Sequence, residues 1–346
     1  MAFSAINSDQ KQHLNLSPGA WEVMDDDMFA FQTSSRSAFL NCVIANFRED
    51  ADATIISTVN RQRRAWCAIL PQALGDTQAA VSALAEEYRA RLLEKALSYP
   101  KGESLKFRIN NENFAYLTNG SLCSEELNYG GNHMGTYLKA IVEEYAAKSY
   151  LERERIYLRP WFDTIQDAIA AKKQLRLQLR DKTWKFIKPY RVMPDALSMY
   201  HYIVGCALPA QADGAAEMTS FSHRVSNLLD VKTVSAGAFL SDAAQKQLEA
   251  QLRVKGAQFM SGDSAEIKVY LTEEGIKKYH RLLHLRPSYC AIEDHSLYVF
   301  RCTPEQIKYY FFKFGADAKV LSPRDLTQAF RQMYALAAET YGCEPR

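Results

Sequence analysis

The N-terminal segment of the chain changes from a strand-like to a helix-like hydrophobic period. Apolar and polar positions alternate at first, with Leu14 and Leu16 on one side and Lys11, His13 and Asn15 on the other. This alternation predicts a short half-buried strand. Two helices follow, in which apolar residues recur every three or four positions: Trp21, Met24, Met28 and Phe31, then Phe39, Val43, Ile44 and Phe47. Since a strand and two helices bury too little surface to fold alone, we expect residues 1–58 to pair with a second copy.

The start of the first helix is marked by its residue types. Ser17 suits the N-cap and Pro18 the first helical position. Residues 59–159 are predicted to be mostly helical, with a β-like segment at Ser104–Leu117 in which apolar residues alternate. A further helix is expected from about Gly135 to Tyr150, and a domain boundary near Pro160.

Residues 160–240 predict a small, strongly curved β-barrel. After a short helix, strands separated by turns are expected at Leu175–Leu179, Trp184–Lys188, Met199–Cys206, Met218–Val225 and Leu229–Val234. On the third of these, Tyr200, Tyr202 and Val204 share one face, and His201 and Ile203 share the other.

Residues 241–346 predict a connecting helix and a C-terminal βαββαβ unit of ferredoxin-like topology, followed by one more helix. Thr272 and Thr303-Pro304 mark the starts of its two inner helices. The fold class is therefore α+β, with several domains.

Composition excludes several classes of protein. Hydrophobic residues make up 47% of the 346 residues, without a run long enough for a transmembrane helix. The N-terminus lacks the basic and apolar regions of a signal peptide, so a cytoplasmic location is expected. The seven cysteines are scattered without a C-x-x-C pair, which indicates free thiols rather than a disulfide framework or a metal site.

Signals of enzymatic chemistry are absent from the sequence. It has no P-loop, no G-x-G-x-x-G and no G-x-S-x-G. The three acids Asp25-Asp26-Asp27 lie within a predicted helix, where their carboxylates diverge. We expect no enzyme, no cofactor and no metal.

The net charge is only +2, but the basic residues are unevenly distributed. Between Lys172 and Arg191 there are eight basic residues and one acid, interleaved with Trp184, Phe186 and Tyr190. Cations neutralise phosphates and aromatic rings stack on unpaired bases, so this pattern is typical of nucleic-acid binding. A solvated barrel surface is the alternative.

The following strands add a candidate pocket, in which Arg191, Tyr202 and Arg224 converge with Ser222 or His223 on a phosphate or nucleotide. The alternative places Tyr202 in the core and the arginines in water. The predicted nucleic-acid-binding residues are Lys185, Lys188, Tyr190, Arg191, Tyr200, His201, Tyr202, Ser222, His223 and Arg224.

Three segments resemble the landmarks of the WYL domain family: residues 188–192, 200–205 and 223–228. The namesake triplet corresponds to His201-Tyr202-Ile203, so only Tyr202 is retained, and Asn227 stands where the family has an arginine. Residues 286–289 and 314–326 resemble the extension that follows many WYL domains. The resemblance implies an Sm-like barrel that senses a ligand, often a nucleic acid.

The N-terminal segment resembles the ribbon-helix-helix family, on its pattern and on Leu16-Ser17-Pro18 and residues 37–41. The combination of a ribbon-helix-helix segment with a WYL domain resembles the accessory proteins encoded beside type VI-D CRISPR effectors. That likeness implies a homodimer that binds single-stranded RNA and enhances an RNA-targeting effector.

A ligand-responsive DNA-binding transcriptional regulator is the alternative function. Its ribbon would present Lys11, His13 and Asn15 to duplex DNA, while the barrel senses a ligand. A ribbon that serves only for dimerisation remains equally open.

Overall fold

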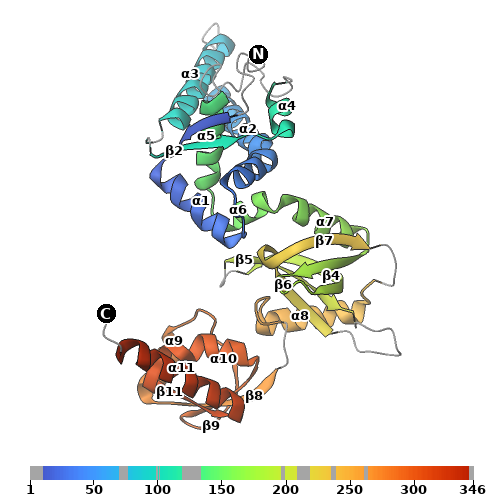
Figure 1. The fold of residues 1–346 in the computed structure, drawn as a ribbon, viewed down its shortest axis with the longest axis vertical. Coiled ribbons are helices and arrows are strands. Elements are labelled where there is room, and N and C mark those ends of the chain that lie inside the picture. Colours follow the sequence, from blue (N-terminus) through green and yellow to red (C-terminus); the bar gives the residue numbers. More distant parts are fainter. Residues whose placement is uncertain are drawn as a thin grey trace. The chain divides into compact units, whose positions relative to one another are not determined.

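The chain forms two compact units, Met1–Arg159 and Pro160–Arg346. The structure is a computed structural model that describes residues 11–69, 77–98, 100, 102–118, 134–195, 199–208, 219–234, 239–260 and 264–342. Within these residues, helices combine with three antiparallel sheets (Figure 1), so the protein is a multidomain α+β protein. Met218, which the sequence assigns to a strand, lies outside the described residues.

The first unit is mainly helical. Its elements in chain order are β1 (Lys11–Asn15), α1 (Pro18–Ala30), α2 (Arg36–Ile69), α3 (Thr77–Leu97), β2 (Ser104–Arg108), α4 (Asn111–Thr118), α5 (Met134–Ala146) and α6 (Tyr150–Tyr157). Ser17 caps α1 as predicted, because its side chain accepts a hydrogen bond from the amide of Ala20. Helix α2 continues well beyond residue 58, where the sequence analysis ends its first unit.

Strand β1 pairs with β2 of the same chain, in an antiparallel register from Lys11 opposite Arg108 to Asn15 opposite Ser104 (Figure 1). The partner strand of β1 therefore comes from the same chain, which also supplies the helices α4 and α5 after β2. The pairing of residues 1–58 with a second copy stays a prediction. We call the β1–β2 pair the ribbon.

The predicted β-like segment Ser104–Leu117 is shorter than expected. Strand β2 ends at Arg108, and α4 begins after Asn110, whose side chain accepts a 2.8 Å hydrogen bond from the amide of Asn113. Asn41 of α2 fixes this corner, since its amide donates to the carbonyl of Arg108 at 2.9 Å. Its side-chain oxygen accepts from the amide of Asn110, also at 2.9 Å.

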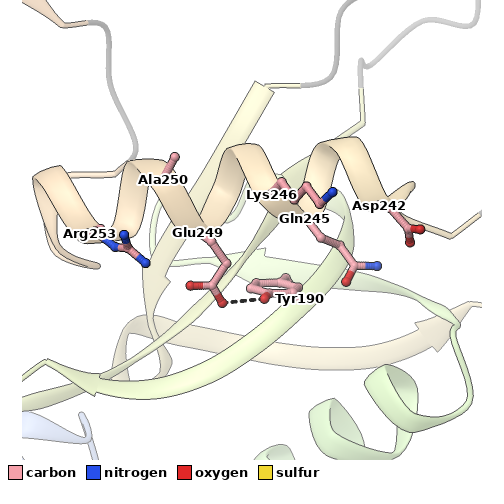
Figure 2. Close-up of a pocket in the computed structure, with 7 residues that line it drawn as sticks. All are labelled: Tyr190, Asp242, Gln245, Lys246, Glu249, Ala250 and Arg253. Atoms are coloured by element: carbon pink, nitrogen blue, oxygen red, sulfur yellow. Dashed lines mark hydrogen bonds between the residues drawn. The ribbon is translucent and has the colours of Figure 1, made fainter.

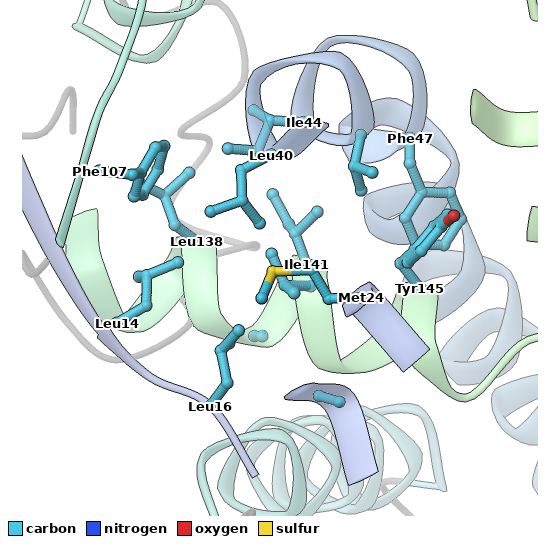
Figure 3. Packing of buried hydrophobic residues seen from close by; sticks show 14 of the residues in the cluster. Leu14, Leu16, Met24, Leu40, Ile44, Phe47, Phe107, Leu138, Ile141 and Tyr145 are labelled. Atoms are coloured by element: carbon cyan, nitrogen blue, oxygen red, sulfur yellow. The ribbon is translucent and has the colours of Figure 1, made fainter. Parts of the chain in front are cut away.

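The core of the first unit joins the ribbon to its helices (Figure 3). It contains Leu14, Leu16, Met24, Leu40, Ile44, Phe47, Phe107, Leu138, Ile141 and Tyr145, all buried. These residues come from β1, β2, α1, α2 and α5 and from the turn between β1 and α1. One face of the ribbon is therefore buried by the helices, which leaves the other face of the pleat exposed.

The second unit begins with α7 (Arg159–Ala170) and a five-stranded antiparallel sheet in the order β6-β5-β4-β3-β7. The strands are β3 (Gln174–Leu179), β4 (Trp184–Asp195), β5 (Tyr200–Ala207), β6 (Thr219–Arg224) and β7 (Leu228–Val234), with a 3-10 turn at Val225–Asn227. The side chains of Leu175, Leu177, Ile187, Ile203 and Val231 are buried on the inner face. The two faces of β5 are confirmed, since Tyr202 and Val204 belong to one buried cluster while His201 contacts Phe162 of α7.

Helix α8 (Asp242–Lys255) follows the sheet and precedes the C-terminal sheet, whose strand order is β11-β8-β10-β9. The elements there are β8 (Ala265–Leu271), α9 (Glu273–Arg281), β9 (Tyr289–Asp294), β10 (Leu297–Cys302), α10 (Pro304–Phe311), β11 (Ala318–Ser322) and α11 (Arg324–Gly342). Thr272 and Thr303 cap α9 and α10 as predicted. Among the helices of the described ranges, none is both long and apolar enough to cross a membrane.

Candidate nucleic-acid interface

Helix α8 covers part of one face of the five-stranded sheet, the face opposite the side chains of Leu175 and Ile203. Leu248 of α8 packs in one buried cluster with Tyr202, Val204 and Cys206 of β5. Tyr202 is only 5% exposed. It therefore packs in a core in this structure, and its predicted role in ligand binding stays a prediction.

Glu249 of α8 holds two of the predicted site residues. Its Oε1 accepts a 2.5 Å hydrogen bond from the Tyr190 hydroxyl. The same oxygen forms an ion pair with Arg191, whose Nη2 donates to it at 2.7 Å. Figure 2 shows Tyr190 beneath α8 with its hydroxyl toward Glu249. The bond to this carboxylate raises the pKa of Tyr190, which therefore remains a donor at neutral pH.

A cavity of about 500 Å³ opens beside this contact. Tyr190 and α8 line it, with the polar side chains Asp242, Gln245, Lys246, Glu249 and Arg253 (Figure 2). Its lining mixes acids and bases, so it has no uniform charge.

The hydroxyls of β6 are also engaged from the α8 side. Ser220 Oγ donates to Oε1 of Gln251 at 2.5 Å, and Ser222 Oγ donates to the carbonyl of Ala257 at 2.6 Å. Val204 stands between Arg191 and Ser222 in the register, so both lie on the face that α8 covers, and each contacts α8 or the segment that follows it. Their predicted convergence on a ligand stays a prediction.

Arg224 occupies a different position, at the end of β6. It lies opposite Tyr202 in the strand register, and its guanidinium carbon lies 3.1 Å from the centroid of the Tyr200 ring. His223 stacks on Phe221 at 6.0 Å between centroids. Burial lowers the pKa of His223, and the charges of Arg180 and Arg224 add to this effect, so its imidazole is neutral at pH 7.

Four buried polar atoms between residues 223 and 227 have no hydrogen-bond partner among the described residues: His223 Nε2, Arg224 Nε, Ser226 Oγ and Asn227 Oδ1. We call these residues the β6 turn cluster. Buried polar atoms in native proteins are nearly always paired with protein groups or ordered water, so this concentration is unusual and makes the turn a candidate site. The predicted His201 is not part of it, because it packs against Phe162 at 5.0 Å.

Lys185 is exposed on β4 and Lys188 is half-buried on the same strand. Two basic residues of the same sheet were missed from the sequence, Arg176 of β3 and Lys232 of β7. The alternation of apolar and polar residues in β3 predicts that Arg176 points away from the core. It does not show which aromatic residues of the neighbouring strand lie opposite Arg176.

The exposed face of the ribbon contains the predicted Lys11, His13 and Asn15. Opposite them in the register stand Arg108, Lys106 and Ser104, all exposed and all missed from the sequence. In the sequence they alternate with the apolar Leu105 and Phe107, a pattern from which their exposed position could have been predicted. Because the strand was not assigned to the ribbon, its outward residues were not included.

No group of three or more residues suited to hold a metal ion occurs in the part of the chain that the structure describes. The cysteines described, Cys42, Cys67, Cys206, Cys290 and Cys302, are free thiols.

The fold has a counterpart among solved structures. The chain is similar in fold to a CRISPR Cas-related protein. The two superpose with a TM-score of 0.71 at 23% identity, over 99% of this chain and 98% of the other. At this identity the likeness concerns the fold alone.

Proteasome accessory factor B/C (PafBC) of Arthrobacter aurescens also aligns, over 71% of this chain and 40% of its own. Its TM-score of 0.31, at 18% identity, is too low to support a shared fold. No protein-family model matches the chain, and no curated protein matches it.

Proposed function

We propose that this protein binds single-stranded RNA through its barrel and acts as an accessory protein of a type VI-D CRISPR effector. The fold likeness to a CRISPR Cas-related protein over nearly the whole chain supports a CRISPR-related role. The WYL-like segments fall on β4, on β5 and at the end of β6. A helix followed by strands in the order β6-β5-β4-β3-β7 supports an Sm-like barrel, and the order β11-β8-β10-β9 supports a ferredoxin-like extension.

The observation that carries the proposal is the β6 turn cluster. A guanidinium offers a planar fork of donors that matches a phosphate. Arg224 is held against Tyr200, and its Nε has no partner within the described chain. Ser226 and Asn227 follow in the chain with a buried hydroxyl and a buried amide oxygen that also lack partners within the described residues.

Binding is tested by fluorescence anisotropy with labelled single-stranded RNA and duplex DNA over a salt series. Arg224→Ala should weaken RNA binding about tenfold or more, since a hydrogen bond to a charged group contributes about 1.5–3 kcal/mol. Arg301→Ala, an exposed arginine of β10, is the matched control and should bind normally. Unchanged affinity of Arg224→Ala would exclude the cluster as the site.

The accessory role needs a separate measurement. The rate of RNA cleavage by a type VI-D effector should rise when the protein is added, and less so for Arg224→Ala. An effector rate that does not respond to the wild-type protein would refute the accessory role while leaving RNA binding intact.

A second candidate function, a DNA-binding regulator, is favoured by the ribbon. Two-stranded ribbons fit the major groove of duplex DNA. Lys11 stands directly opposite Arg108, so two cations lie side by side on the exposed face of the ribbon. Tight duplex binding together with weak RNA binding would favour this function over the first.

The intrachain ribbon also bears on the predicted homodimer. That prediction followed from the small core of a strand and two helices, to which β2 and α5 of the same chain now add. Sedimentation of the purified protein would show whether it dimerises by another surface.

A further inference from the structure

The outer face of the barrel has a second part, formed by β7, β3 and β4. Arg176 of β3 pairs in the register with Phe186 of β4 on one side and with Lys232 of β7 on the other. Gln178 pairs with Trp184 in the same way. Because side chains alternate along a strand, these residues share the face opposite the buried Leu175, Leu177 and Ile187.

Two aromatic rings and two cations form a layered group on this face. The guanidinium carbon of Arg176 lies 3.9 Å from the Trp184 ring centroid and 5.9 Å from that of Phe186. The Lys232 ammonium lies 5.7 Å from the Trp184 centroid. We call Arg176, Trp184, Phe186 and Lys232 the aromatic–basic face.

The group is accessible although its rings are large. Phe186 is 42% exposed and the Lys232 side chain 62% exposed. The Lys232 ammonium forms a 2.6 Å ion pair with Asp230, an exposed contact that a phosphate can replace at little cost. The buried Nε of Arg176 has no hydrogen-bond partner within the described residues. Exposed aromatic surface next to cations is the combination that single-stranded nucleic acids use, since bases stack on rings and phosphates bind cations.

We propose that the aromatic–basic face binds a single-stranded stretch of nucleic acid, with bases stacked on Trp184 and Phe186 and phosphates at Arg176 and Lys232. The inference rests on the proposed function, because it names a second surface for the same RNA strand. The aromatic–basic face lies on β7, β3 and β4, whereas the β6 turn cluster lies at the end of β6 and in the 3-10 turn that leads into β7.

The chemistry selects unpaired strands. A ring can stack only on a base whose π-face is open, and bases inside a duplex are already stacked on their neighbours. Cations beside the rings add a sequence-independent phosphate contact. The face is therefore expected to bind single strands with little sequence preference, and duplexes weakly.

The test uses the full-length protein and a fluorescein-labelled 12-nucleotide RNA of mixed sequence, alone or annealed to its complement. Trp184→Ala should weaken single-strand binding by about 5- to 150-fold, the usual loss for one stacked base. Trp184→Phe keeps a ring and should lose much less. Phe29→Ala, which removes an 88% exposed ring of α1, is the matched control and should bind like the wild type.

Intrinsic fluorescence gives a second readout that a purely structural role would not change. Stacking should quench tryptophan emission when RNA is added, and Trp184→Phe should lose this quenching while it still binds. If Trp184→Ala fails to fold, the fluorescence of Trp184→Phe and the affinity of Arg176→Gln still decide the question.

The outcomes separate this inference from the proposed function. If the wild type binds no single-stranded RNA, the proposed function and this inference both fail. If the wild type binds RNA but Trp184→Ala and Arg176→Gln bind equally well without altered quenching, only the inference fails. Equal affinity of the wild type for duplex and single strand would also overturn it.

Discussion

The ribbon and the aromatic–basic face are both exposed antiparallel surfaces with basic side chains, but only the second displays aromatic rings. On the ribbon, Lys11, Lys106 and Arg108 stand among His13, Asn15 and Ser104. On the barrel, Arg176 and Lys232 lie over Trp184. Cations alone neutralise the phosphates of any nucleic acid, whereas rings need unpaired bases. From this difference we expect duplex DNA to bind at the ribbon and single strands to bind at the aromatic–basic face.

The largest expected effect comes from breaking the unit that holds the ribbon. Asp27 of α1 is fully buried and accepts from Nε of Arg153 at 2.7 Å, from Nη2 at 3.1 Å and from the Tyr145 hydroxyl at 2.7 Å. Asp27→Ala leaves a largely buried guanidinium without its partner and should cost about 3–5 kcal/mol. Denaturant unfolding followed by circular dichroism measures the loss.

Binding assays on the same variant test whether the two surfaces are independent. Asp27→Ala should lose any duplex binding and keep single-stranded RNA binding. Asp26→Ala, an exposed neighbour on the same helix, should change neither property. If Asp27→Ala lost the binding of duplex DNA and of single-stranded RNA alike, the two surfaces would not act independently.

The second effect concerns the ribbon charges directly. The double variant Lys106→Gln and Arg108→Gln removes two cations and leaves the buried Leu105 and Phe107 in place. If both side chains contact phosphates, the slope of log affinity for duplex DNA against log salt should fall by about 2. RNA affinity should stay constant. A salt slope equal to that of the wild type would show that the ribbon does not contact DNA.

Local patterns were enough to predict most elements of the fold. Ser17, Thr272 and Thr303 cap helices where the sequence places them, because a cap depends on a few neighbouring residues. The pairing of β1 with β2 was not predictable in this way. It depends on α2 and α5 bringing together strands far apart in the chain, and no local pattern specifies that contact.

The candidate site was predictable only in part, for the same reason. The turn at Asp181-Lys182 sets the hairpin register, so the pairing of Arg176 with Phe186 could have been counted from it. The contacts of Arg191 and Tyr190 with Glu249 could not be predicted from the sequence. An amphipathic helix such as α8 can cover either face of a sheet, and no local pattern specifies which. The sequence therefore led to residues on the face that α8 covers, and Arg176 and Lys232 on the exposed part of that face were not among the predicted site residues.

A smaller effect is expected from a substitution on the face of the sheet that α8 covers. Glu249→Gln removes the ion pair with Arg191, whose side chain is 47% exposed. An exposed pair of this kind contributes at most about 1 kcal/mol, so RNA should bind up to about fivefold more tightly if Arg191 then reaches a phosphate. Glu274→Gln, which breaks the exposed pair with Lys277, is the control. Weaker RNA binding by Glu249→Gln would show that Glu249 supports the site instead of competing for it.

The smallest expected effect is a pH dependence from His223. Burial lowers the pKa of His223 in the folded barrel below the value of about 6.5 in an unfolded chain. Above about pH 6.5 the imidazole is neutral in both states, and its contribution to stability is complete. As pH falls from there toward the folded pKa, the unfolded state binds the proton first, so the free energy of unfolding decreases.

Replacing His223 by Gln should remove this part of the pH dependence. Urea unfolding of wild type and variant, measured between pH 7.5 and 5, isolates it, because the other titrating groups contribute equally to both proteins. The stability difference between the two proteins should be constant above pH 6.5 and should shift in favour of the variant below it. Parallel curves over the whole range would mean that His223 titrates alike in the folded and unfolded chain, and that burial does not hold it neutral beside Arg224.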